Sequence, residues 1–300
     1  MGLFIFFFLV IGAAVDYLYL DGFTPAGFPF PIATVLALGF ATVTTLTAYY
    51  GGSSLILGSL GAEKLAMQIP EHRELRNIVT EMALASGSAM PQVYVINDSA
   101  PNALATGTNE KNAAICVTTG LLTLLDREET QGVVAHEMSH IRNQDTLLMT
   151  LVSVLVAGIA ILADWGQRGA FRSRSNRRDG DKNPALFMPL LLLVALSPLL
   201  AQLLAMAVSR QREYLADATA AEYTRNPRGL ARALEKIRDA AAPVNKATRG
   251  TAPLFFSDPL RRRLDDSESG LANLLTTHPP IARRIALLSE MAGMAQASNR

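Results

Sequence analysis

Four long apolar segments alternate with polar stretches along the chain. Residues 3–15 are uninterrupted apolar sequence, and residues 31–62 carry no charged side chain. Two later apolar runs, 147–163 and 184–209, are separated by the polar stretch 164–183. A helix needs about 20 apolar residues to cross the ~30 Å hydrocarbon core of a bilayer, a length that the third run barely reaches. The pattern predicts about four transmembrane helices in two hairpins.

Basic residues predict how these segments are oriented. No lysine or arginine precedes Lys64, so the basic start of a cleaved signal peptide is missing. Because cytoplasmic loops are rich in lysine and arginine, the loop at 16–30 is expected outside and the chain after Lys64 in the cytoplasm. The stretch 164–183 holds several arginines. The third and fourth segments therefore form either a shallow hairpin or a crossing pair that carries a basic loop outward.

Composition agrees with a membrane protein. Half of the residues are hydrophobic, 18% are charged, and the mean hydropathy is +0.23. A net charge of +1 offers no basic surface for nucleic acid, which we do not expect as a partner. The single cysteine, Cys116, lies in an apolar run and is expected to be a buried small hydrophobe.

The polar regions predict helices and short strands. Residues 71–86 have helical spacing, whereas 92–96 and 114–118 are rich in β-branched residues and predict strands. Asn226 and Pro227 start a further helix, and residues 241–268 predict a long loop with room for a lid. In the predicted helix 71–86, the apolar positions are Leu75, Ile78, Val79, Met82 and Leu84.

One pentapeptide, His136-Glu137-Met138-Ser139-His140, carries the strongest chemical signal. Two histidines four residues apart lie on one helix face, where both imidazoles can reach one zinc ion at about 2.0–2.1 Å. Glu137 is then placed to act as a base on a water held by the metal. Asp126 and Glu129 form a capping-box pattern that predicts the start of this helix. A pair of histidines on a solvated helix face is the alternative.

A third metal ligand is expected after the fourth apolar segment. Catalytic zinc takes three protein ligands and leaves a fourth position open. Glu213 is the best candidate in this sequence, and Asp217 lies one helical turn further on, where it can orient a ligand imidazole. Acidic residues one turn apart also occur on solvated helix faces, but the position directly after an apolar segment favours the ligand interpretation.

Two further stretches are candidate substrate contacts. Asn102, Ala103, Leu104, Ala105 and Thr106 lie between turns and predict an exposed edge strand, which could pair with an extended peptide through main-chain hydrogen bonds. A plain hairpin edge is the alternative. His278 precedes two prolines that start the final helix, and it could either donate a hydrogen bond to an oxyanion or cap that helix.

Taken in order, these motifs resemble the HtpX family of membrane-bound zinc metallopeptidases over essentially the whole chain. The matching elements are the zinc pentapeptide, the stretch 102–107, Glu213 with Asp217, and His278-Pro279-Pro280 with Arg284. The family usually has phenylalanine where this chain has Leu104, which concerns substrate contact more than chemistry. The resemblance implies that His136, His140 and Glu213 bind one zinc ion per chain, with Glu137 as the catalytic base. Asp217 would orient a ligand histidine by accepting a hydrogen bond from its imidazole, and His278 and Arg284 would line the site.

The resemblance also implies location and substrates. It indicates a multi-pass protease of the bacterial cytoplasmic (inner) membrane, with its active site facing the cytoplasm, that cuts misfolded or damaged membrane proteins. Its partners would be these substrates, the lipid bilayer and other components of membrane quality control. The expected fold class is mainly α with a small β-sheet: a zincin-like (α+β) peptidase domain on about four transmembrane helices. Its expected parts are an N-terminal hairpin (1–62), two halves of the peptidase domain (63–145 and 210–300) and a second hairpin (146–209).

Two other functions remain open at this point. A protease of prenylated proteins, of the CAAX type, would share the zinc motifs but is expected to have more membrane segments than four. A membrane scaffold could bind unfolded segments along the Asn102 edge, with zinc in a structural role. Glu137 argues against the scaffold, because a structural site needs no base beside an open position.

Overall fold

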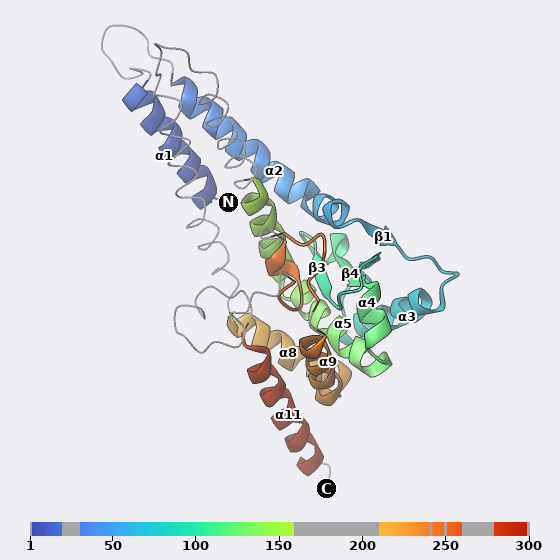
Figure 1. The fold of residues 1–300 in the computed structure, drawn as a ribbon. Coiled ribbons are helices and arrows are strands. Elements are labelled where there is room, and N and C mark those ends of the chain that lie inside the picture. The colour runs from blue at the N-terminus through green and yellow to red at the C-terminus, as the bar shows by residue number, and fades with distance from the viewer. Residues whose placement is uncertain are drawn as a thin grey trace. The chain divides into compact units, whose positions relative to one another are not determined.

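The computed structural model describes residues 2–19, 31–158, 210–240, 242–248, 251–259 and 279–298. The chain forms two compact units. The first comprises Met1–Tyr50 and Val154–Leu204, and the second comprises Gly51–Ser153 and Ala205–Arg300. Figure 1 shows the order of the elements within each unit.

The first unit contains α1 (Gly2–Tyr19) and most of α2 (Ile32–Leu60). Phenylalanines of α1 pack with apolar residues that include Ala41. Asp16 accepts hydrogen bonds from the main-chain N–H groups of Ala33 (3.0 Å) and Thr34 (2.8 Å). These N–H groups at a helix start have no partner within the helix, so α1 supplies the cap of α2.

Only α2, among the described residues, is long and apolar enough to be a candidate membrane span. The helices Phe4–Ala14 and Asp145–Gly158 are apolar but shorter. The fourth predicted segment, 184–209, lies outside the described residues, as does the end of the third. The prediction of about four transmembrane helices is therefore not confirmed, and one candidate span is found.

The second unit contains a four-stranded sheet in the order β1-β2-β4-β3. Its strands are β1 (Ala62–Lys64), β2 (Gln92–Ile96), β3 (Ala103–Thr106) and β4 (Ala114–Thr118). The pairs β1–β2 and β3–β4 are antiparallel, whereas β2 and β4 are parallel. β3 therefore lies at one edge, with Leu104 opposite Cys116 of β4. Cys116 is buried, as the sequence predicted.

Helices make up the larger part of this unit, so the prediction of a mainly α fold with a small sheet is confirmed. Among the described residues, the α-helices that lie wholly within this unit are α3 (Pro70–Ser86), α4 (Thr119–Leu124), α5 (Arg127–Arg142), α8 (Arg210–Thr224), α9 (Pro227–Asp239) and α11 (Ile281–Ser298). Short 3-10 helices lie at Glu110–Asn112 (η1) and Ala252–Leu254 (η2).

The centre of the second unit is α5, which packs against α3, α8, α9 and β3. Nearly every residue of its second half is buried. Gly132 allows a close approach to α9, because a Cβ there would lie 2.9 Å from Cα of Leu230. A helix surrounded in this way can present polar side chains to a protected interior, and α5 carries the zinc pentapeptide.

One predicted core position on α3 is wrong. Leu75, Ile78, Val79 and Met82 are buried, but Leu84 is 79% exposed and Ala83 is buried instead. At about 100° per residue, position 84 lies on the opposite side of the helix from position 75. The apolar character of Leu84 misled the prediction, because the helix period alone places this side chain in solvent.

Candidate metal centre

The start of α5 is fixed by the capping box that the sequence predicted. Glu129 N–H donates to Asp126 (2.9 Å), and Asp126 N–H donates back to the Glu129 carboxylate (2.9 Å). Lys236 of α9 forms an ion pair with the same carboxylate at 2.6 Å. The first turn of α5 is thereby held at a defined position, which sets the direction of every side chain further along the helix.

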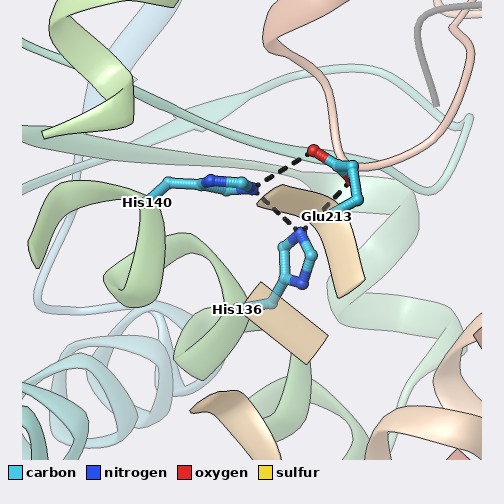
Figure 2. A group of neighbouring side chains, drawn as sticks. All are labelled: His136, His140 and Glu213. Carbon is cyan, nitrogen blue, oxygen red and sulfur yellow. Dashed lines mark hydrogen bonds and ion pairs between the residues drawn. The ribbon is translucent and has the colours of Figure 1, made fainter. Parts of the chain in front are cut away.

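His136, His140 and Glu213 converge at one point in the interior. Figure 2 shows the three side chains pointing toward one another, the histidines from α5 and the glutamate from α8. The Nε2 atoms of the histidines are 3.2 Å apart, and Glu213 oxygens lie 3.5 Å from His140 Nε2 and 3.8 Å from His136 Nε2. Tetrahedral ligands at 2.0–2.1 Å from zinc would be about 3.3 Å apart. The donor set and its spacing therefore fit a zinc ion.

A buried carboxylate supports His136 from behind. Asp217, on α8, lies 3.0 Å from Nδ1 of His136. Arg284 of α11 donates to both oxygens of Asp217, at 2.7 and 2.8 Å, and is fully buried. The hydrogen bond to Asp217 keeps the proton on Nδ1 and leaves Nε2 free to bind a metal. We call His136, Asp217 and Arg284 the inner cluster.

A second carboxylate supports His140, and the sequence interpretation missed it. Asp145 lies 3.1 Å from Nδ1 of His140 and accepts from Arg212 of α8 at 3.0 Å. The chain leaves α5 through Gln144, whose φ of 60° is in the left-handed region, and this turn brings Asp145 back beside the helix end. The available signal was an acidic residue just beyond the helix, within reach of a ligand histidine. We call His140, Asp145 and Arg212 the outer cluster.

Burial and charge act differently on the two imidazoles. Burial lowers the pKa of His136 to about 4, so that its ring is neutral near pH 7. For His140, burial by itself lowers the pKa, but the hydrogen bond to Asp145 and the charge of Glu213 outweigh it and raise the pKa to about 9. The interior thus favours a positive charge beside Glu213, and a bound metal would replace the proton on His140.

Glu137 is buried beside the three candidate ligands. Burial, with a smaller contribution from Glu213, raises its pKa to about 7, against the opposing effects of His140 and Arg284. The main-chain N–H of Ala105 on β3 donates a hydrogen bond to Glu137. A carboxylate whose pKa lies near 7 is suited both to accept and to return a proton at neutral pH.

The other sequence-predicted residues fall into two groups. Arg284 lies in the centre, where its guanidinium is 3.8 Å from Glu213. Asn102 and the strand β3 lie beside α5, at the edge of the sheet, but all four residues of β3 are buried, so the predicted exposure of this edge is wrong. His278 lies outside the described residues.

These features define a class of protein. Hydrolysis of a peptide bond by a metal-activated water needs three protein ligands and a neighbouring base, in an interior that keeps the ligands oriented. Two histidines one turn apart on one helix, a glutamate from a later helix and a second glutamate beside the first histidine are the arrangement of metallopeptidases.

Comparisons with known proteins identify the family. The model for peptidase family M48 matches residues 70–292, and the chain belongs to this family. Peptidases of this family are zinc-dependent, and the chain is a metalloprotease by its membership.

Several proteins similar to this chain are named "Protease HtpX homolog". That of Thermoanaerobacter pseudethanolicus is 42% identical over 86% of this chain and 84% of its own length. Those of Caldanaerobacter subterraneus subsp. tengcongensis (42% identity; 96% and 93%) and Streptococcus uberis (36%; 95% and 94%) match nearly from end to end. The predicted resemblance to the HtpX family is thereby confirmed. The crystal structure of S. mikatae Ste24p is similar to this chain with a TM-score of 0.49 at 20% identity, over 93% of this chain and 63% of that chain.

Proposed function

We propose that the protein is a zinc endopeptidase of the bacterial cytoplasmic membrane that hydrolyses peptide bonds of misfolded or damaged membrane proteins. His136, His140 and Glu213 bind one zinc ion, and Glu137 is the general base. The observation that carries this proposal is the convergence of three ligand atoms, all within 4.8 Å of one another, in a buried site that also contains Glu137.

The residues of the chain divide the chemistry among them. Zinc, when bound, supplies a Lewis acid that lowers the pKa of water toward ~7. Glu137 accepts the proton of the attacking water and returns it to the leaving amine. Asp217 holds His136 in the tautomer that a metal requires, and Asp145 does the same for His140.

Negative charge develops on the oxygen of the peptide carbonyl during hydrolysis, and hydrogen-bond donors besides the metal can stabilise it. Arg284 is a permanent cation in this interior, and its position 3.8 Å from Glu213 places it beside the ligands. His278, which directly precedes the described residues 279–298, is proposed as a further donor. We also propose that residues 63–145 and 210–300 supply the two halves of the peptidase domain.

Location rests on two observations. The candidate span α2 precedes the peptidase residues, and the lysine and arginine residues begin at Lys64, directly after it. We therefore propose a multi-pass membrane protein whose catalytic residues face the cytoplasm. Substrates tethered in the same bilayer would meet the site at a raised effective concentration.

The experiment that tests this function compares Glu137→Gln with the parent protein, both purified in detergent. Zinc content is measured for each, and cleavage of casein is followed by gel electrophoresis. We expect both proteins to hold one zinc ion, with cleavage reduced at least ~100-fold in Glu137→Gln. The exposed Glu222 on α8 gives a matched control, since Glu222→Gln should cut like the parent. A parent that holds zinc and cuts nothing would favour the scaffold function instead.

A further inference from the structure

The outer edge of β3 is occupied by another part of the same chain. β3 pairs with β4 along one edge only. On the other edge, Leu104 forms an antiparallel bridge with Phe255, and Phe256 N–H donates to the carbonyl of Ala103 at 2.8 Å. This pairing explains why the edge is buried rather than exposed. Residues 255–257, which we call the resident segment, lie on the edge that the sequence predicted for an unfolded substrate: Phe255 is extended and forms the bridge, and the chain bends at Phe256 and Ser257.

Phe256 enters the metal centre itself. Its ring lies 5.0 Å from the ring of His136, at 90°, and the guanidinium carbon of Arg284 lies 4.9 Å from its centroid. Arg284 also donates to the main-chain carbonyl of Phe256 at 3.3 Å. The ring of Phe256 therefore contacts both His136, a candidate zinc ligand, and the buried Arg284, and Arg284 also binds the Phe256 carbonyl.

The residue that follows, Ser257, is held by Asn102 through its backbone. Asn102 accepts from the N–H of Ser257 (3.2 Å) and donates to the carbonyl of Ser257 (3.0 Å). A side-chain amide that pairs with both main-chain groups of one residue binds an extended peptide whatever its sequence. The resident segment is thus held by main-chain contacts that any peptide can make and by the buried side chains of Phe255 and Phe256.

We propose that the resident segment occupies the peptide-binding position of the site, so that a substrate must displace it, and that Phe256 marks a subsite for a bulky aromatic or aliphatic side chain beside His136. The inference rests on the proposed function. The main-chain groups of β3 can pair with one strand at a time on their outer edge, so the resident segment and a substrate exclude each other. The apparent affinity for substrate is then reduced by the fraction of molecules in which the segment stays docked.

A binding experiment tests this without requiring catalysis. A fluorescein-labelled synthetic peptide with the sequence of residues 252–258 is titrated with the full-length Glu137→Gln protein, and fluorescence anisotropy gives its Kd. Adding Phe256→Ala to that protein removes the aromatic contact of the internal competitor. We expect the labelled peptide to bind at least about tenfold more tightly to this protein. A matched control, Leu84→Ala at an exposed position, should leave Kd unchanged. Equal or weaker binding after Phe256→Ala would overturn the inference.

A reversible lock provides a second test in case Phe256→Ala destabilises the fold. Leu104 and Phe255 are bridge partners, whose Cα atoms in an antiparallel pair lie about 4.5–5.5 Å apart, within the range that a disulfide spans. The lock is Leu104→Cys with Phe255→Cys, in a Cys116→Ala background because Cys116 is opposite Leu104 in the sheet. Oxidised protein should cut casein at least about tenfold more slowly than the same protein after reduction with a phosphine.

The two tests separate this inference from the proposed function. If the resident segment does not move during catalysis, the disulfide-linked variant cuts casein equally fast before and after reduction. The inference then fails while the peptidase function stands. If the zinc-loaded parent does not cut casein, the proposed function fails, and the peptide titration still decides whether residues 255–257 compete for the edge of β3.

Discussion

The inner and outer clusters have the same composition but different surroundings. In each, a histidine of α5 contacts a carboxylate, and an arginine contacts that carboxylate. Arg284 of the inner cluster is fully buried and binds Asp217 through two hydrogen bonds, whereas the Arg212 side chain is 41% exposed and makes one to Asp145. The inner cluster thus lies in the core, and the outer cluster lies nearer to solvent. We expect the inner cluster to contribute more to the free energy of unfolding, and both clusters to contribute to metal affinity.

The largest effect is expected from Arg284→Met. Removing the guanidinium leaves Asp217 charged and buried without its cation, and breaking a buried pair in this way costs about 3–5 kcal/mol. At about 2–4 °C per kcal/mol for a chain of this size, thermal unfolding in detergent should begin roughly 10 °C lower. A fall of less than about 2 °C would correspond to a loss of less than about 1 kcal/mol. Such a result would show that the inner cluster does not stabilise the core.

Asp217→Asn is expected to act mainly on the metal. An amide cannot stabilise the His136 tautomer as a carboxylate does, and loss of such a supporting group typically weakens metal binding about 10–100-fold. Competition with a chromophoric zinc chelator measures the change. An unaltered zinc affinity would separate Asp217 from the metal and leave it a structural partner of Arg284 alone.

Asp145→Asn should give a weaker form of the same effect. Its hydrogen bond to His140 is similar in length, but the Arg212 side chain is 41% exposed, so water can solvate the guanidinium when the charge of Asp145 is removed. We expect zinc affinity to fall about tenfold, at the low end of the range for such groups. The chelator assay, applied to both variants, shows which one loses more zinc affinity. A larger loss in Asp145→Asn than in Asp217→Asn would contradict the prediction.

Arg212→Met is the smallest perturbation. Only the arginine of this ion pair is near solvent, and pairs at such positions contribute at most about 1 kcal/mol and are screened by salt. The unfolding temperature should therefore fall by no more than about 4 °C. The experiment is repeated at high salt, where the parent and the variant should converge. A loss comparable to that of Arg284→Met would mean that the outer cluster is as important to the core as the inner one.

Local sequence signals predicted the parts of the centre that depend on one helix at a time. The capping box of Asp126 and Glu129 defines the start of α5, and helical spacing then aligns His136 with His140. Glu213 was found by its order in the chain, since a third ligand must come from a later helix. These predictions needed only the 3.6-residue period and the coordination preference of zinc.

Contacts between distant segments could not be derived in this way. The contact of Arg284 with Asp217 joins residues 67 apart, and the family resemblance, which placed Arg284 at the site beside His278, did not predict it. The bridge between Leu104 and Phe255 depends on how a loop folds back over the sheet, so the strand was predicted correctly and its exposure was not. Asp145 was missed because its position depends on a left-handed residue, Gln144, which no pattern in the sequence indicates.

The central claim is that one zinc ion is bound by His136, His140 and Glu213. Zinc K-edge absorption spectroscopy on purified Glu137→Gln protein, with metal content measured on the same sample, tests it most directly. The account predicts one zinc per chain with two imidazoles and at least one oxygen ligand at about 2.0–2.2 Å, and loss of the metal in Glu213→Ala. A sulfur ligand, or full zinc content in Glu213→Ala, would contradict it.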